Sequence, residues 1–191
     1  MSGIDGGLRE RGKARRREAI LRAAMTLFAE KGFEHATTAD VAAAAEVSPR
    51  TVTLYFPSKQ ELALAHFTDF ADRLAAALTE ASPGTPTMDV VEGWLTDELG
   101  RRGDLDTLAH AMFEANPQLA ALRNARLGHV VALAADRIAA ERGVAAGDFA
   151  SRMAAAASGT VIGELLSSPT SGHVAAAVGF LRAGLAALPS A

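Results

Sequence analysis

Apolar residues recur along most of this chain with the spacing of amphipathic helices. They return every three or four positions, and no segment alternates apolar and polar residues as a strand does. Clusters of Gly, Pro and Ser interrupt the pattern. The sequence therefore predicts an all-α protein of about nine helices. Apart from two short helices within residues 37–56, the expected helices cover residues 11–31, 58–80, 87–101, 104–115, 117–142, 148–166 and 173–188.

One segment in the first third of the chain is the most informative. Thr37 is a suitable N-cap for a first short helix, and Asp40 completes a capping box three residues later. The chain then turns at Glu46. Ser48 caps the second short helix, whose first position holds Pro49, where a missing N–H costs nothing. Two short helices joined by a tight turn predict a helix-turn-helix.

The second short helix has a polar side suited to DNA. Arg50, Thr51 and Thr53 lie on the side opposite Val52 and Phe56. In a helix that enters the major groove, only a few side chains near its N-terminus must reach base edges. Arg50 can donate two hydrogen bonds to a guanine, and the threonines can approach a base edge, a thymine methyl or a phosphate. We therefore expect this helix to bind DNA.

Several unrelated residue types fall at fixed spacings around this segment. They are Phe33, Thr37, Thr38, Val41, Ala42, Ala45, Val47, Ser48, Thr51, Tyr55, Phe56, Pro57, Ser58, Lys59 and Leu62. At these positions the chain resembles the N-terminal domain of the TetR/AcrR family of bacterial transcriptional regulators. The resemblance implies an all-α homodimer, usually a repressor. It also implies an operator-binding domain in residues 1–57 and an effector-binding and dimerisation domain in residues 58–191. The chain departs from the family at Glu46, where Gly is common.

The resemblance also assigns roles to single residues. Tyr55, Lys59 and Thr38 match family positions that contact phosphate. Two alternatives remain open: Thr51 only supports the start of its helix, and Tyr55 belongs mostly to the core. The expected DNA-binding residues are Arg15, Thr38, Ser48, Arg50, Thr51, Thr53, Tyr55 and Lys59.

The net charge of −3 hides an uneven distribution of charge. Residues 1–60 hold ten of the 19 Lys and Arg residues but only seven of the 22 Asp and Glu residues. Six basic residues lie between Arg9 and Arg17. We expect this basic arm, which leads into the first helix, to bind phosphates without sequence preference. The alternative is a solvated tail.

Composition limits the remaining classes of protein. Hydrophobic residues make up 49% of the chain and aromatic residues only 5%, which favours closely packed helices. The chain contains no cysteine, so no disulfide framework is expected and a reducing cytoplasm is the natural location. The N-terminus lacks an apolar signal region, and the apolar stretches are too short to span a bilayer. We expect a soluble cytoplasmic protein.

No catalytic motif is evident. The chain has no glycine-rich phosphate loop, no paired metal-binding histidines at helical spacing and no nucleophile elbow. Its five histidines lie in five different segments, so we expect no metal and no cofactor. One alternative to a DNA-binding regulator remains. It is an all-α ligand-binding or catalytic domain whose helix-turn-helix no longer binds DNA.

By the same family resemblance, the helices after residue 58 surround a pocket for a mostly apolar effector. Ordinary core packing is the alternative for each candidate. The candidate pocket residues are Phe67, Phe70, Trp94, His110, Met112, Phe113, Arg126 and His129. The segment of residues 117–142 resembles the mycofactocin-regulator branch, whose members are associated with acyl-thioester effectors.

The last two helices are rich in small residues and apolar on nearly all sides. Such helices need cover on more than one face, and a second copy of the same pair is the simplest cover. The alternative is an alanine-rich core within one chain. The candidate dimer-interface residues are Ala155, Gly159, Gly163, Ala176, Gly179, Phe180, Ala183 and Gly184.

Overall fold

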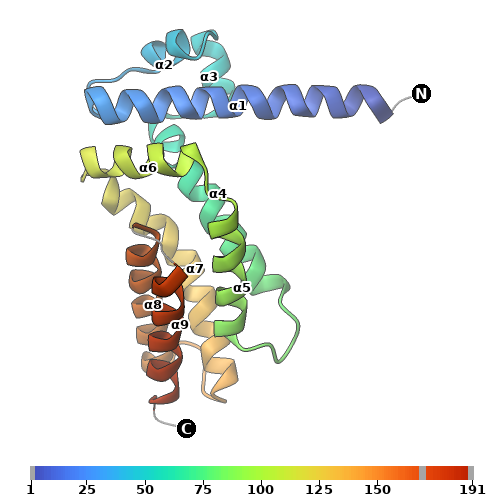
Figure 1. Cartoon of the computed structure of the whole chain (residues 1–191), viewed down its shortest axis with the longest axis vertical. Helices are drawn as coiled ribbons and strands as arrows, with labels where there is room; N and C mark the ends of the chain where they lie inside the picture. The colour runs from blue at the N-terminus through green and yellow to red at the C-terminus, as the bar shows by residue number, and fades with distance from the viewer. Residues whose placement is uncertain (1–2, 168–170, 189–191) are drawn as a thin grey trace. The chain divides into compact units, whose positions relative to one another are not determined.

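The computed structural model describes residues 3–167 and 171–188, and these ranges contain nine helices and no strand (Figure 1). The predicted all-α class is confirmed. In chain order the helices are α1 (Gly3–Lys31), α2 (Thr38–Ala44), α3 (Pro49–Tyr55), α4 (Lys59–Glu80), α5 (Thr87–Gly100), α6 (Asp104–Ala115), α7 (Leu119–Glu141), α8 (Phe149–Ser167) and α9 (Ser171–Ala186). No helix among the described residues combines the length and apolarity needed to cross a bilayer.

The first helix is longer than expected. α1 begins at Gly3 rather than near residue 11, so the basic segment between Arg9 and Arg17 belongs to the helix itself. The expectation of an arm ahead of the helix is therefore wrong. Arg, Lys, Glu and Ala are good helix formers and extend the helix through this polar segment. The Arg11 side chain also donates a hydrogen bond to the Gly7 carbonyl at 3.0 Å.

The chain forms two compact units, and each contains segments that are distant in the sequence. Unit 1 comprises Met1–Thr68 and Gly103–Arg123, and unit 2 comprises Asp69–Arg102 and Asn124–Ala191. This division differs from the one expected after residue 57. The start of α4 and all of α6 join the helix-turn-helix, and the reason lies in the packing of unit 1.

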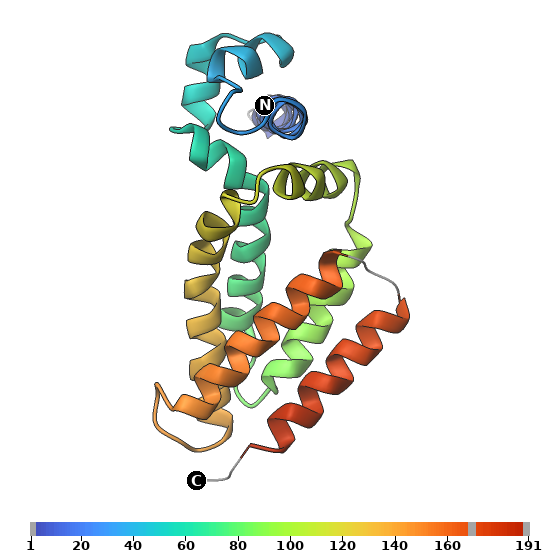
Figure 2. The same ribbon diagram turned by 90° about the vertical axis from the view of Figure 1, so that its left-hand side faces the viewer.

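In unit 1, α1 lies between two sets of helices. α2 and α3 lie on one side of it and α6 on the other, as both views show (Figures 1 and 2). In Figure 2 the blue α1 is seen nearly end-on, with the olive α6 beside it. The buried core residues come from all these helices and from the start of α4. They include Ile20, Leu21, Met25, Phe28, Phe33, Val41, Val52, Phe56, Leu62, Met112 and Leu119.

A single buried side chain joins the helix ends of unit 1. Asn116 is 1% exposed. Its Nδ2 donates to the carbonyl oxygens of Phe28 at 2.7 Å and Met112 at 2.8 Å. Its Oδ1 accepts from the backbone N–H of Phe33 at 2.5 Å. Phe28 and Met112 lie in the last turns of α1 and α6, where carbonyl groups lose their intrahelical partners. One carboxamide thus caps both helices and the loop after α1.

Unit 2 has its own core and polar links. The core is formed by α4, α5, α7, α8 and α9, and it includes Leu74, Leu78, Val91, Trp94, Leu95, Val130, Ile162, Leu165, Val178 and Leu181. Arg73 of α4 makes two hydrogen bonds to the buried carboxylate of Glu98 on α5, one of them 2.9 Å long. Arg182 of α9 contacts Asp89 and Glu92 of α5, each at 2.6 Å. Hydrogen bonds to these two carboxylates, Glu92 first, raise the pKa of the Arg182 guanidinium.

Replacing Asn116 should destabilise unit 1. In the variant Asn116→Leu the amide of Phe33 and the carbonyls of Phe28 and Met112 lose a partner in a buried site. A buried polar group left without its partner costs about 1–3 kcal/mol, so we expect the free energy of unfolding to fall by about 3 kcal/mol. Urea denaturation followed by circular dichroism measures this change.

Gln118 provides the matched control. It is exposed, and its side chain lies 3.5 Å from Asn116 Oδ1. Gln118→Leu should leave the free energy of unfolding within about 0.5 kcal/mol of the parent, as most surface substitutions do. Equal stabilities for the Asn116 and Gln118 variants would show that the carboxamide does not hold the helix ends together.

Candidate functional site

The helix-turn-helix begins with the predicted capping box. Thr37 Oγ1 accepts a hydrogen bond from the backbone N–H of Asp40 at 3.1 Å, and Asp40 Oδ2 accepts from the backbone N–H of Thr37 at 2.8 Å. Hydrogen bonds from the Thr37 side chain and backbone lower the pKa of the Asp40 carboxyl. The carboxylate stays ionised at neutral pH and fixes the start of α2.

The turn between α2 and α3 passes through a left-handed residue. Glu46 has φ of 53°, and among the described residues no other non-glycine residue has a positive φ. The backbone N–H of Val47 closes the turn on the Ala42 carbonyl at 2.9 Å. A left-handed conformation costs a residue with a Cβ about 1–2 kcal/mol, which accounts for the frequent glycine at this family position.

The cap and the packing of α3 determine which side chains it exposes. Ser48 Oγ accepts from the backbone N–H of Thr51 at 3.0 Å, as predicted, and Pro49 is the first helical residue. Val52 is fully buried and Phe56, directly after the helix, is 4% exposed. The opposite face carries the exposed residues Arg50, Thr53 and Leu54. This short face is the surface that α3 offers to a ligand.

The predicted DNA-binding residues on α3 differ in their surroundings. Thr51 is half-buried, and its hydroxyl lies 2.8 Å from Ser48 Oγ, an arrangement that supports the helix start. Thr53 is exposed, and its hydroxyl donates to the Pro49 carbonyl at 3.2 Å. Tyr55 is half-buried against the unit 1 core. The sequence left two alternatives open: Thr51 only supports the start of its helix, and Tyr55 belongs mostly to the core. The positions of both residues agree with these alternatives.

Lys59 and Thr38 begin the helices that follow and precede α3 in the chain, α4 and α2. Both are half-buried. The Lys59 ammonium donates to the Glu34 carbonyl at 3.2 Å and lies 4.5 Å from the centre of the Phe33 ring. An ammonium group has three donor hydrogens, so one bond to a carbonyl leaves donors available for a phosphate. The structure therefore holds Lys59 in a fixed position that remains compatible with a phosphate contact.

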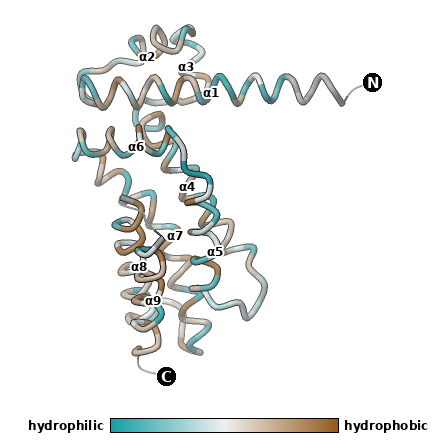
Figure 3. The backbone as a smooth tube through the Cα atoms, in the orientation of Figure 1, coloured by the Kyte–Doolittle hydropathy of each residue, from teal (hydrophilic) through white to brown (hydrophobic). Residues whose placement is uncertain are grey.

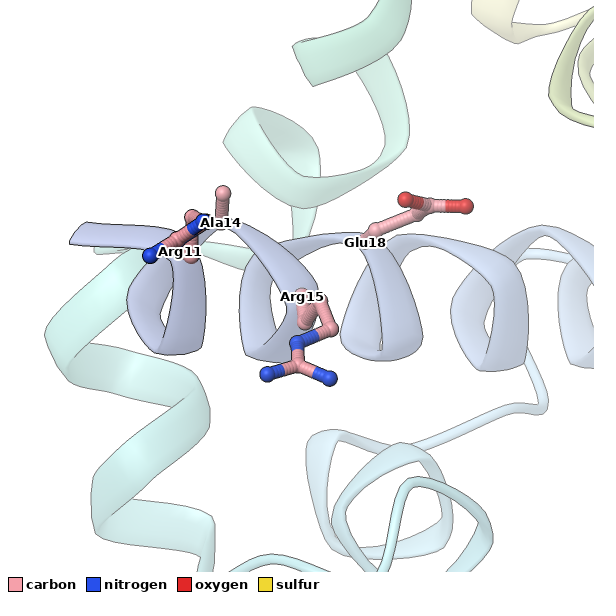
Figure 4. Close-up of a pocket in the computed structure, with 4 residues that line it drawn as sticks. All are labelled: Arg11, Ala14, Arg15 and Glu18. Carbon is pink, nitrogen blue, oxygen red and sulfur yellow. The ribbon is translucent and has the colours of Figure 1, made fainter. Parts of the chain in front are cut away.

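The basic side chains of α1 form an exposed series. Arg9, Arg11, Lys13, Arg15 and Arg16 are all exposed. Figure 4 shows Arg11, Ala14, Arg15 and Glu18, which line an open hollow along this helix. These cations belong to the same unit as the helix-turn-helix, whose α3 carries the exposed face described above.

The eight predicted pocket residues are divided equally between the two units. Met112 is fully buried in the core of unit 1, where α6 packs on α1. Phe67 and Phe113 form an edge-to-face pair in the same unit, with ring centres 6.2 Å apart. His110 is exposed and pairs with Glu114 one turn later. Within unit 1 these side chains contribute to packing or to the surface.

In unit 2 the predicted pocket residues include a buried aromatic pair. Phe70 and Trp94 meet edge to face, with ring centres 4.8 Å apart. Trp94 is 6% exposed, and its Nε1 donor is buried without a hydrogen-bond partner among the described residues. Arg126 and His129 of α7 are exposed. A buried donor without a partner is uncommon and marks a place where an acceptor fits.

The predicted dimer residues of α9 lie on one exposed face. Its other face is buried through Val178 and Leu181. A Cβ atom added at Gly179 or Gly184 would meet no neighbouring group of the chain within 4 Å, and Phe180 is 67% exposed. Figure 3 colours most of α9 in hydrophobic tones. The exposed face of α9 consists of Ala176, Gly179, Phe180, Ala183 and Gly184.

The predicted dimer residues of α8 are placed differently. Ala155 is 2% exposed and packs with Ala135 and Ile138 of α7. A Cβ at Gly159 would lie 3.7 Å from the Val131 side chain, also on α7. Gly163 is exposed. Ala155 and Gly159 therefore face α7 within the chain, because α7 covers the side of α8 on which they lie.

Two sets of exposed apolar residues were not among the predicted site residues. On α8 the large exposed apolar residues are Phe149 (70%) and Met153 (48%), one helical turn apart. On α3 Leu54 is 82% exposed. A helical wheel places Leu54 near Arg50 and away from Val52, a signal that the sequence contains. On α8 the exposed Arg152, Thr160 and Glu164 lie on the same side of the helix as Phe149 and Met153, so the sequence contains a comparable signal there. Among the described residues no group of three His, Asp or Glu side chains is arranged as a metal site.

Sequence comparisons match the helix-turn-helix segment of unit 1 to a known family. The family model of the bacterial regulatory proteins of the tetR family matches residues 20–66, which include α2, α3 and the start of α4. The HTH-type transcriptional regulator TcmR of Streptomyces glaucescens is 35% identical over 115 residues. That alignment covers 59% of this chain and 51% of TcmR, so the chain spans about half the length of this curated relative.

Solved structures share the fold over nearly the whole chain. NalD, the secondary repressor of the MexAB-OprM multidrug efflux pump in Pseudomonas aeruginosa, superposes with a TM-score of 0.63 at 19% identity. The match covers 91% of this chain and 97% of NalD. The Thermus thermophilus repressor FadR, in complex with lauroyl-CoA, superposes with a TM-score of 0.54 at 22% identity and covers 92% and 96%. The helix-turn-helix and the sequence matches together show that residues 20–66 resemble the DNA-binding segment of the tetR family of bacterial regulatory proteins.

Proposed function

We propose that the protein is a homodimeric transcriptional repressor that binds a palindromic operator and is released from it by a small molecule. The observation that carries the proposal is the exposed face of α3, held by a capped turn within the segment that matches the tetR family. In this proposal residues 1–57 contact DNA, and residues 58–191 bind the effector and form the dimer. The protein would act in the bacterial cytoplasm, where the DNA is.

Arg50 is the proposed base-reading residue. It is exposed on α3, and among the predicted DNA-binding residues of this helix it alone is a cation. A guanidinium presents two parallel donors that match the O6 and N7 acceptors of guanine. The exposed cations of α1, among them Arg15, would neutralise phosphates whatever the base sequence. Base reading and phosphate binding thus belong to different helices.

The exposed face of α9 supports the proposed dimer. A symmetric pair buries the same patch from each copy, and small residues allow two helices to approach closely. Gly179, Ala183 and Gly184 are small and exposed, and Phe180 adds a large apolar surface among them. On α8, Phe149 and Met153 would extend the interface in place of Ala155 and Gly159.

The buried pair of Phe70 and Trp94 supports an effector site in unit 2. Small-molecule sites are mostly apolar with a few placed polar groups, and the buried Trp94 Nε1 donor is such a group. An apolar chain ending in a carbonyl oxygen would satisfy it. The solved FadR complex contains lauroyl-CoA, an acyl thioester, which makes this ligand the natural first probe.

The DNA-binding proposal predicts different effects for two arginines. A duplex pool with a randomised core, selected with the parent protein, should yield a palindromic site. Replacing Arg50 with Ala should weaken binding to that site by about 1–3 kcal/mol and relax preference at one base position in each half-site. The control Arg15→Ala should weaken all sequences alike and reduce the slope of log K against log salt by about one. Failure to select any sequence would refute the proposed function.

The dimer proposal predicts that Gly179→Glu gives a folded monomer. A Cβ at Gly179 meets nothing within the chain, and Glu is a better helix former than Gly, so the isolated chain tolerates the change. In a close interface the new carboxylate would be desolvated without a partner. Sedimentation velocity at micromolar concentration measures the change. Gly93→Glu, at an equally open and exposed site on α5, is the matched control. A monomeric parent, or a dimeric Gly179→Glu variant, would contradict the interface.

The effector proposal predicts that lauroyl-CoA changes the fluorescence of Trp94, the single tryptophan of the chain, and releases operator DNA. A tenfold loss of operator affinity needs about 1.4 kcal/mol of coupling. Trp94→Phe keeps an aromatic ring but removes the donor. Calorimetry on this variant should show affinity for lauroyl-CoA reduced by about threefold to tenfold, the loss of one neutral hydrogen bond. An unchanged parent spectrum, with DNA still bound, would exclude this ligand class at this site.

A further inference from the structure

Leu54 is an apolar side chain that unit 1 leaves almost entirely in water. It is 82% exposed, and between residues 9 and 68 and between 103 and 123 of unit 1 no other large apolar side chain is exposed. A single exposed leucine is common on protein surfaces and needs no explanation by itself. The position of Leu54 on α3, however, indicates a binding role for this exposed side chain.

Leu54 shares the face of α3 that carries Arg50. It follows Arg50 by four residues, so the two side chains lie one helical turn apart on the same side. Thr53 borders the same face, while Val52 is buried on the opposite one. The helix thus presents one cation and one branched apolar group next to each other.

The chemistry of this face matches one feature of the major groove. Phosphates and base edges offer charges and hydrogen-bonding groups, and the C5-methyl of thymine is the apolar group that a base displays there. The neighbouring cation, Arg50, and the exposed cations of α1 favour a polyanion over an apolar protein surface as the occupant. A leucine reaching that methyl would remove both apolar groups from water.

We infer that Leu54 is a specificity-determining residue that contacts the C5-methyl of a thymine in each operator half-site. The inference rests on the proposed DNA-binding function and adds a second base, a thymine, to the guanine that Arg50 is proposed to read. Four residues of helix span about 6 Å, and base pairs are stacked about 3.4 Å apart. The thymine should therefore lie within about two base pairs of the guanine bound by Arg50.

The test uses a change in the DNA that removes only the methyl group. The palindromic site selected from the randomised pool is resynthesised with deoxyuridine in place of each thymine in turn. Affinities are then measured for the parent and for Leu54→Ala and Leu54→Met. Leu54 is exposed, so its replacement should leave the melting temperature unchanged, and this is checked first.

We expect one deoxyuridine position to weaken binding by the parent about threefold to tenfold and to have no effect on Leu54→Ala. Leu54→Ala should bind the unmodified site about threefold to tenfold more weakly than the parent, and Leu54→Met should retain most of the methyl dependence. Equal effects of every deoxyuridine on the parent and on Leu54→Ala would overturn the inference. They would place Leu54 against the sugar-phosphate backbone or in solvent, while operator binding itself would stand. Absence of any selected site would overturn both proposals.

Discussion

The arrangement of the helices in unit 1 depends on the hydrogen bonds of the Asn116 side-chain amide. Three backbone groups from three segments meet this one side chain in a site closed to water. These three hydrogen bonds fix the end of α1, the end of α6 and the path of the chain from α1 into α2. Because an unpaired buried polar group is costly, these hydrogen bonds stabilise the three segments as one assembly. This requirement makes α6, which is distant from the helix-turn-helix in the sequence, a part of the same compact unit.

The rest of unit 1 follows from that arrangement. With α1 held at its C-terminal end, the core residues Ile20, Met25 and Phe28 form a platform that buries Val41 and Val52. Burying Val52 rotates α3 so that Arg50 and Leu54 face away from the core. The packing of the buried face of α3 thus determines which side chains its opposite face would present to the major groove of DNA.

Local chemistry could be predicted from the sequence, and long-range chemistry could not. The caps at Thr37 and Ser48 involve atoms within a few residues of one another, so their spacing alone was sufficient. The strain at Glu46 was indicated by the family resemblance, in which glycine is common at that position. The role of Asn116 was not predicted, because nothing near it in the sequence indicates partners 83 and 88 residues away.

The inner face of α8 was misassigned because small apolar residues lie on both of its sides. The alanine run obscures the helical period that distinguishes a buried face from an exposed one. Arg152 and Glu164 do mark the exposed side, which also carries Ala156, whereas Ala155 lies on the side that α7 covers. On α9 the larger residues Val178 and Leu181 mark the inner face, and the prediction of an exposed small-residue face agrees with the structure.

The turn residue Glu46 has a consequence for the time that such a protein spends on DNA. It keeps a strained backbone conformation and an exposed carboxylate beside α3. A negative charge there repels every phosphate backbone alike, whereas contacts to base edges depend on sequence. In the proposed function, this repulsion lowers the affinity for random DNA and for the operator by the same factor and leaves their ratio intact. The carboxylate thus makes dissociation from both easier without changing the preference for the operator.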